Sequence, residues 1–93
     1  MGDELEADIK QDLKNRGKKI LKHVKKYKQL GLNISFYRKA AGMTQMQLAE
    51  QADISRTYLS NIEAPNVTIP FTTTVLFNIS DALGVDLNKL FTP

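Results

Sequence analysis

The side chains in this sequence that could do chemistry are mainly hydrogen-bonding groups. The stretch Thr44–Glu63 contains an arginine, an asparagine and several hydroxyl side chains, all of which can donate hydrogen bonds. The one histidine, His23, lies in a lysine-rich segment with no predicted nucleophile or carboxylate partner beside it. The sequence has no cysteine, glycine-rich phosphate loop, metal-ligand cluster or paired-carboxylate motif. We therefore predict a protein that is not an enzyme and that uses no cofactor or metal ion.

Two helices and a short turn must position the polar groups of this stretch. Thr44 can cap the first helix and Ser55 the second, which we expect to end near Glu63. Steeply crossing helices need a small residue where they approach, an apolar residue in the turn and apolar residues on the inner face of the second helix. The residues that meet these needs are Ala49, Ile54, Leu59 and Ile62. Asp53 can adopt the positive φ that the turn often requires, though less readily than glycine. The spacing predicts a helix-turn-helix.

The other predicted elements are also helices, so the expected fold is all-α. Before Thr44, the apolar residues Ile34, Tyr37 and Ala41 suggest one face of a helix that Gly42 closes. Residues 64–71 are expected to form a loop; the alternative for residues 67–71 is a short extended segment. After it, Thr72 caps a helix with Leu76, Ile79 and Leu83 facing inward and Gly84 as its end, and Asp86 caps a short helix over residues 87–90.

Residues 1–28 form a segment of different character, which we call the N-terminal arm. It holds nine lysines and arginines against five acidic residues, whereas residues 29–93 hold four against five. The apolar residues of the arm recur at helical spacing, namely Leu5, Ile9, Leu13, Ile20, Val24 and Tyr27. We therefore expect a basic amphipathic helical arm, bent or split at Gly17, followed by one domain over residues 29–93. Its charge suggests a polyanionic partner; the alternative is a lysine-coated face in water.

The sequence also limits where the protein works. No apolar run approaches the length of about 20 residues that spans a bilayer, and the acidic N-terminus does not resemble a signal peptide. The lack of cysteine fits a reducing compartment. We predict a cytoplasmic protein.

Residues 30–91 resemble the Cro/lambda-repressor-type helix-turn-helix family, also called the XRE family. The resemblance rests on pieces that occur in the family's order and spacing: Leu30-Gly31, Ile34, Arg38, Gly42-Met43-Thr44-Gln45, Leu48-Ala49-Glu50, Ile54-Ser55-Arg56, Ile62-Glu63, Ala82-Leu83-Gly84-Val85 and Leu90-Phe91. It implies a five-helix repressor-like domain that binds double-stranded DNA as a homodimer. It further implies a transcriptional regulator, most simply a repressor that acts by occupying its operator.

The resemblance also implies roles for particular residues. A recognition helix over residues 55–63 would enter the major groove, because family members read base edges with this helix. The base-reading candidates are Arg56, Thr57, Ser60 and Asn61, and the phosphate-contacting candidates are Thr44, Gln45, Ser55 and Tyr58. Tyr58 could instead pack within the domain, and the four base-reading candidates could form a solvated face. Arg38 and Glu63 match a structural ion pair of the family.

Three departures from the family pattern qualify this interpretation. The loop over residues 64–71 carries no charge, and Asp53 stands where glycine is common. Leu32 and Phe36 lie on a face of the first helix that is normally polar. We hypothesise that the arm, through Leu13, Ile20, Val24 and Tyr27, covers these two residues in the same chain or in a second subunit; the alternative is that both are singly exposed.

Two further questions stay open at the level of sequence. The dimer contact could use Leu87, Leu90 and Phe91, or the arm. The same fold could also serve as a protein-interaction module or as an antitoxin-like adaptor, with the arm contacting a protein partner.

Overall fold

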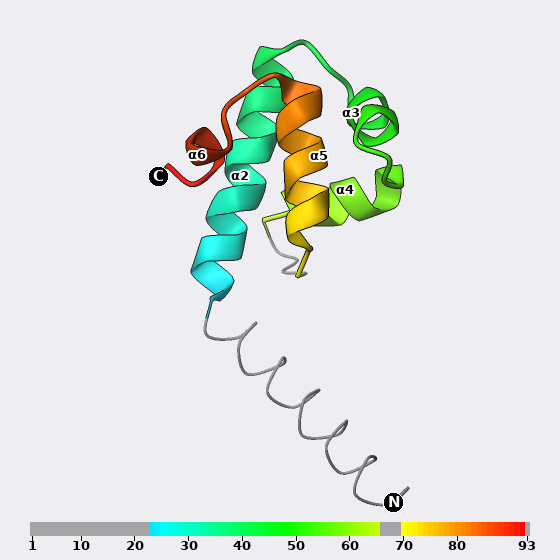
Figure 1. The fold of residues 1–93 in the computed structure, drawn as a ribbon. Coiled ribbons are helices and arrows are strands. Elements are labelled where there is room, and N and C mark those ends of the chain that lie inside the picture. Colours follow the sequence, from blue (N-terminus) through cyan, green and yellow to red (C-terminus); the bar gives the residue numbers. More distant parts are fainter. Residues whose placement is uncertain (1–22, 66–69, 93) are drawn as a thin grey trace, which may run out of the picture.

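The computed structural model describes residues 23–65 and 70–92, which form five α-helices and contain no strand (Figure 1). The helices are α2 (Val24–Ala40), α3 (Gln45–Gln51), α4 (Arg56–Glu63), α5 (Thr73–Leu83) and α6 (Leu87–Leu90). The predicted all-α, five-helix fold is confirmed. Residues 3–22 of the predicted arm helix lie outside the described residues, as do residues 66–69 of the predicted loop.

The predicted capping residues begin the helices where expected. Thr44, Ser55 and Thr72 each accept a hydrogen bond from the backbone N–H three residues later. Asp86 precedes α6 without a side-chain cap. Asp53, in the turn before α4, has a positive φ of 58°, as the sequence predicts for this turn. Local rules therefore locate all the helix starts after residue 40.

Helix α2 differs from the expected first helix. It begins at Val24 and runs without interruption through Lys28 and Gln29, where the sequence predicts the boundary between arm and domain. The division at this boundary stays a prediction, because most of the arm lies outside the described residues. Gly31 lies inside α2, at a place where α4 comes very close. A Cβ atom on Gly31 would collide with the carbonyl oxygen of Ile62, so only glycine permits this approach.

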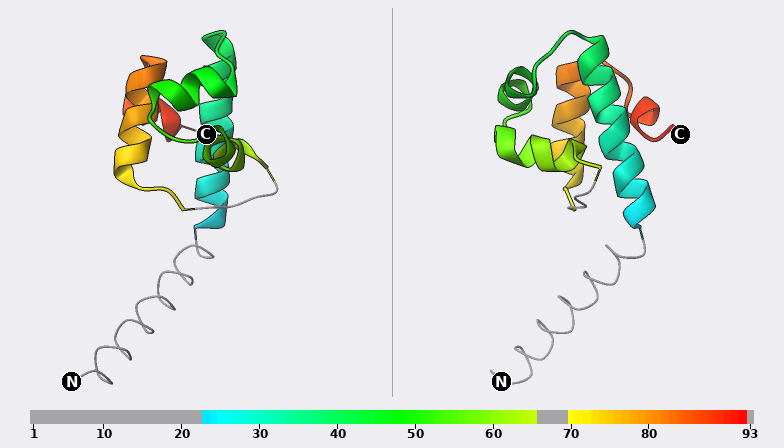
Figure 2. Two further views of the ribbon diagram at one scale, coloured as in Figure 1. Left: turned by 90° about the vertical axis from the view of Figure 1, so that its right-hand side faces the viewer. Right: turned by 180° about the vertical axis from the view of Figure 1, so that it is seen from behind.

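Helices α2 and α5 lie side by side, and α4 crosses both steeply (Figures 1 and 2). Helix α3 packs on α4 and α5, while α6 packs on α2 and α5. The fully buried centre combines residues from every helix: Ile34, Leu48, Leu59, Ile79 and Leu90. Ala49 is buried and Ile54 packs against the core, in agreement with the predicted helix-turn-helix. Contacts with α2 and α3 thus hold α4 in place.

Two expectations about apolar residues are wrong. Ala41 follows the end of α2 and is exposed, so the inner face of α2 consists of Leu30, Ile34 and Tyr37 instead. Leu90 is fully buried, and the Asn33 side-chain amide donates a hydrogen bond of 2.8 Å to its carbonyl oxygen. Leu90 therefore belongs to the core and offers no surface to a second subunit.

Leu32 and Phe36 are exposed, at 50% and 65% of their surface. Val24 and Tyr27 belong to the same continuous helix, α2, so they do not cover this pair within one chain. That part of the arm hypothesis is wrong because a helix holds its residues at fixed positions along one axis. Leu13 and Ile20 lie outside the described residues, and contact with a second subunit stays a prediction.

Candidate nucleic-acid interface

Helix α4 presents its polar side chains on the face opposite the core. Leu59 and Ile62 are buried, which orients the rest of this eight-residue helix. The predicted base-reading residues are Arg56 and Thr57, which are exposed, and Ser60 and Asn61, which are partly exposed. Ser60 lies four residues after Arg56 and three after Thr57, and Asn61 lies four after Thr57, so these side chains are neighbours on one side of the helix. The structure therefore brings these four side chains together on the outer surface of α4.

Thr44 and Ser55 lie at the starts of the two helices of the motif. The Thr44 hydroxyl accepts from the Gln47 backbone N–H at 3.1 Å, and the Gln47 side chain accepts from the Thr44 backbone N–H at 2.9 Å. The Ser55 hydroxyl accepts from the Tyr58 backbone N–H at 3.0 Å. Because each hydroxyl accepts through its oxygen, its own proton can still be donated to a phosphate oxygen.

Gln45 and Ser60 meet at a hollow of about 260 Å³ between the end of α2, the start of α3 and α4. The Gln45 amide nitrogen donates a hydrogen bond of 3.2 Å to Oε1 of Glu63. The sequence patterns do not predict this contact. Gln45 is therefore held by the scaffold at the same time as it faces the hollow beside the recognition helix.

Arg38 and Glu63 form a bidentate ion pair beneath α4. The Arg38 Nε donates to Oε2 at 2.8 Å and Nη2 donates to Oε1 at 2.9 Å, while Nη1 donates to the Met43 carbonyl oxygen at 2.8 Å. Only 10% of the Arg38 side chain and 5% of the Glu63 side chain are exposed. One guanidinium therefore joins α2 both to the last residue of α4 and to the turn before α3.

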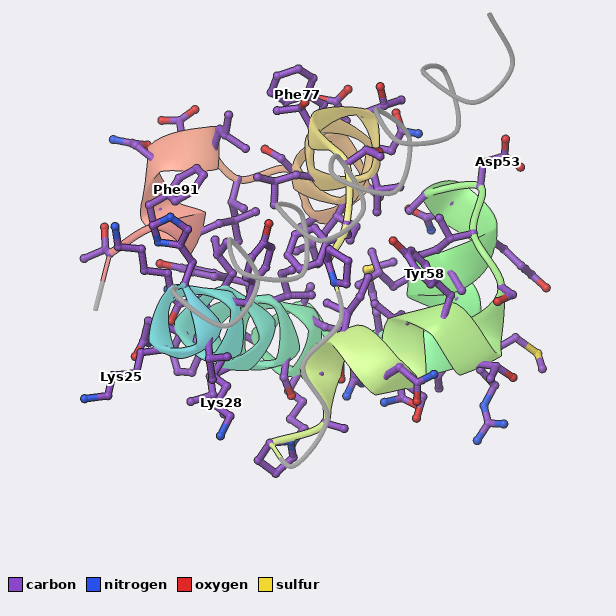
Figure 3. The ribbon with its side chains drawn as sticks, turned by 90° about the horizontal axis from the view of Figure 1, so that it is seen from below. Lys25, Lys28, Asp53, Tyr58, Phe77 and Phe91 are labelled. Atoms are coloured by element: carbon purple, nitrogen blue, oxygen red, sulfur yellow. The ribbon has the colours of Figure 1, made fainter. Side chains whose placement is uncertain are left out.

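Tyr58 lies on α4 beside the interior of the domain (Figure 3). Its hydroxyl donates to the Pro70 carbonyl oxygen at 3.4 Å, a long distance for an O–H···O bond. Burial raises the pKa of this hydroxyl, so it keeps its proton at neutral pH. Tyr58 therefore packs within the domain with only a weak hydrogen bond. Replacing the Pro70 oxygen by a phosphate oxygen as the acceptor would cost little free energy. The phosphate contact itself stays a prediction.

Two residues that hold the helices together are not assigned a role by the sequence patterns. Gly31 allows α4 to approach α2, and the only sequence signal is its place in the Leu30-Gly31 pair of the family pattern. Asn33 ties α2 to the carbonyl oxygens of Leu90 and Thr92, which lie 57 and 59 residues later in the chain. Neither helical periodicity nor capping rules predict such distant contacts.

Asp53 points away from the domain at the turn before α4 (Figure 3). A carboxylate at this place adds negative charge next to the predicted DNA-facing helix, as the sequence departure indicates. Within the described residues, no group of acidic, histidine or cysteine side chains could hold a metal ion. No helix in this part of the chain is long and apolar enough to cross a membrane.

Comparisons with known proteins agree with this geometry. The family described as "Helix-turn-helix domain" matches residues 31–92. The fold is similar to the restriction-modification controller protein C.AhdI from Aeromonas hydrophila, with a TM-score of 0.65 and 22% identity over 70% of this chain and 96% of that one.

Two further solved structures are similar. The hypothetical transcription factor NHTF from Neisseria has a TM-score of 0.67 and 28% identity over 73% of this chain and 76% of that chain. The clp gene regulator ClgR from C. glutamicum has a TM-score of 0.63 and 26% identity over 69% and 80%. Among proteins of curated function, none matches the chain.

Proposed function

We propose that this chain, which belongs to the helix-turn-helix domain family, is a transcription regulator that binds specific sequences of double-stranded DNA. The observation that carries the proposal is the outer face of α4, where Arg56, Thr57, Ser60 and Asn61 lie together on a helix held by the core. Arginine pairs with guanine O6 and N7, and asparagine with adenine N6 and N7, in the major groove. Two of the similar structures, a hypothetical transcription factor and a gene regulator, support the same function.

The remaining roles follow from docking α4 in the major groove. Thr44, Gln45, Ser55 and Tyr58 would contact phosphates and thereby set the position of α4 on the duplex. A homodimer would read two half-sites about 34–36 Å apart. The protein would act without catalysis, as a repressor in the cytoplasm that occupies its operator.

Selection of bound duplexes from a random DNA pool tests this function. We expect an inverted repeat to be enriched, since a symmetric dimer reads two copies of one half-site. Affinity for that site should fall steeply with salt, with a logarithmic slope of about −0.9 for each phosphate contacted. A folded protein that enriches no sequence would contradict the proposal. It would instead favour a protein-interaction module, to which the exposed Leu32 and Phe36 would contribute.

Arg56→Ala and Asn61→Ala test base reading. Each variant should lose about 1–3 kcal/mol of discrimination, which is roughly fivefold to 150-fold, at one base pair of the selected site. The fold should be unchanged because neither side chain is buried. Competition binding against single-base variants of the site measures the loss, and Glu50→Ala on the exposed face of α3 serves as a control. An equal loss on selected and random DNA would make the two residues phosphate contacts.

Tyr58→Phe tests the phosphate contact of the tyrosine hydroxyl. Affinity should fall a few-fold and equally on selected and random duplexes, because phosphate contacts carry no sequence information. The free energy of unfolding should change by less than about 1 kcal/mol, since the bond to Pro70 is long. Parallel binding curves and thermal melts separate the two effects. An unchanged affinity would assign Tyr58 to packing alone.

A further inference from the structure

A groove lies at the end of the domain where the chain enters α2. It has a volume of about 660 Å³ and runs between the first turns of α2 and α5 and the end of α6. Apolar side chains form most of its lining: Tyr27, Leu30, Phe71, Leu76, Leu90 and Phe91. Tyr27 and Phe71 meet edge to face, with ring centroids 5.5 Å apart. The size suits a bound segment with a few large apolar side chains.

The rim of this groove is basic. Lys25 and Lys26 line it beside His23, and both lysines are exposed. Figure 3 shows Lys25 projecting from the start of α2 and Phe91 facing the same end of the domain. No acidic residue is among the described residues that line the groove. An apolar floor with a cationic rim suits an acidic amphipathic segment, whereas DNA would leave the floor unfilled.

The N-terminal arm contains such a segment. Its charges are segregated, since residues 1–13 hold five acidic residues and one lysine, whereas residues 14–28 hold eight basic residues and no acidic one. Within the acidic part, Leu5, Ile9 and Leu13 recur at every fourth position. In a helix these three would share one face and the carboxylates would flank it. The acidic part thus matches the groove both in its apolar side chains and in the sign of its charge.

The connection between segment and groove is short. Residues 14–22 join the acidic part to His23, which itself lines the groove. Nine residues reach at most about 30 Å when extended, enough to reverse and return. Gly17, in the middle of the connection, allows the backbone to turn. A short tether also gives an effective concentration in the millimolar range, which favours the chain's own segment over that of a second copy.

We infer that residues 3–13 bind in the groove of their own chain, with Leu5, Ile9 and Leu13 against its apolar floor and the flanking carboxylates beside Lys25 and Lys26. This occupant covers the partly exposed rings of Tyr27 and Phe71 and the exposed ring of Phe91, which lie above the buried leucines of the floor. It also holds the acidic part of the arm beside the start of α2 and the end of α6. The inference does not depend on the proposed DNA binding.

Cross-linking in the chain of residues 1–93 tests the inference. This sequence contains no cysteine, so a cross-linker reacts only with the two cysteines that are introduced. Ile9→Cys is combined with Thr73→Cys, which lines the groove, and treated with a short bismaleimide. The matched control combines Ile9→Cys with Glu50→Cys on α3, which lies away from the start of α2 (Figure 1). At about 10 µM protein, the groove pair should form a product of monomer mass about 100-fold faster than any dimer product.

Two charge-reversal variants test the charge complementarity in the same experiment. Lys26→Glu at the rim should slow cross-linking of the groove pair several-fold, whereas Lys39→Glu, near the other end of α2, should leave the rate unchanged. Far-ultraviolet circular dichroism of each variant verifies that it is folded. Equal rates for the Thr73 and Glu50 pairs would overturn the inference. A product mainly of dimer mass would overturn it too and place a second copy's segment in the groove.

Discussion

Glu63→Ala is expected to lower the free energy of unfolding by about 3–5 kcal/mol, the largest loss that we predict for a single substitution. The variant leaves the Arg38 guanidinium with no carboxylate in a site where only 10% of its side chain is exposed. Stranding a buried charge in this way costs far more than the intact pair contributes. The Gln45 amide loses its acceptor at the same time.

Thermal melting measures this loss. In a domain of this size, each 1 kcal/mol shifts Tm by about 4–8 °C, so the shift should exceed about 10 °C. Glu50→Ala makes the same chemical change at an exposed position of α3 and should shift Tm little. A double variant, Arg38→Met with Glu63→Leu, should be more stable than Glu63→Ala because it strands no charge. A Tm for Glu63→Ala equal to that of Glu50→Ala would contradict the structural role.

Gly31→Ala should destabilise the domain by about 1–3 kcal/mol, the usual range for forcing extra volume into a packed site. The added methyl group would collide with the Ile62 carbonyl oxygen, which belongs to the backbone of α4 and cannot rotate away. Helix propensity acts in the opposite direction, because alanine is more favourable than glycine inside a helix by about 1 kcal/mol. The sign of the change therefore decides between steric conflict and local propensity.

Chemical denaturation of Gly31→Ala, with Lys28→Ala as the control, makes this measurement. Lys28 lies on the exposed face of the same helix, and its replacement should change stability by no more than about 0.5 kcal/mol. DNA affinity of Gly31→Ala should also fall in any fraction that folds, since α4 must move away from α2. A variant more stable than the native chain would show that α4 yields without cost, and the glycine would then be unnecessary.

The sequence predicts what short-range rules govern. Thr44, Ser55 and Thr72 mark helix starts because a hydroxyl there accepts from the third backbone N–H along. Asp53 is recognisable as a turn residue because aspartate tolerates positive φ. Leu59 and Ile62 are recognisable as inward because a helix repeats every 3.6 residues. The family resemblance adds the pairing of Arg38 with Glu63, which are 25 residues apart.

The remaining contacts depend on how distant segments meet. The sequence predicts a boundary between arm and domain after Lys28, yet α2 continues through it, and packing against Ile62 makes Gly31 an internal residue of this helix. The sequence offers Leu90 as a candidate for a dimer contact, but the packing of α6 on α2 and α5 buries it. Gln45 shares the carboxylate of Glu63 only because α3 and α4 meet at that point. Periodicity and capping carry no information about these encounters.

Helices α3 and α4 are short, which affects how the domain unfolds. Helices of seven and eight residues are not stable alone, so both persist only through their contacts with each other, of α3 with α5 and of α4 with α2. The helix-turn-helix should therefore exchange its amide hydrogens with solvent only when the whole domain unfolds, as one cooperative unit. The outer face of α4 should then be ordered without any ligand, so the proposed DNA binding would carry no entropy cost for folding this helix.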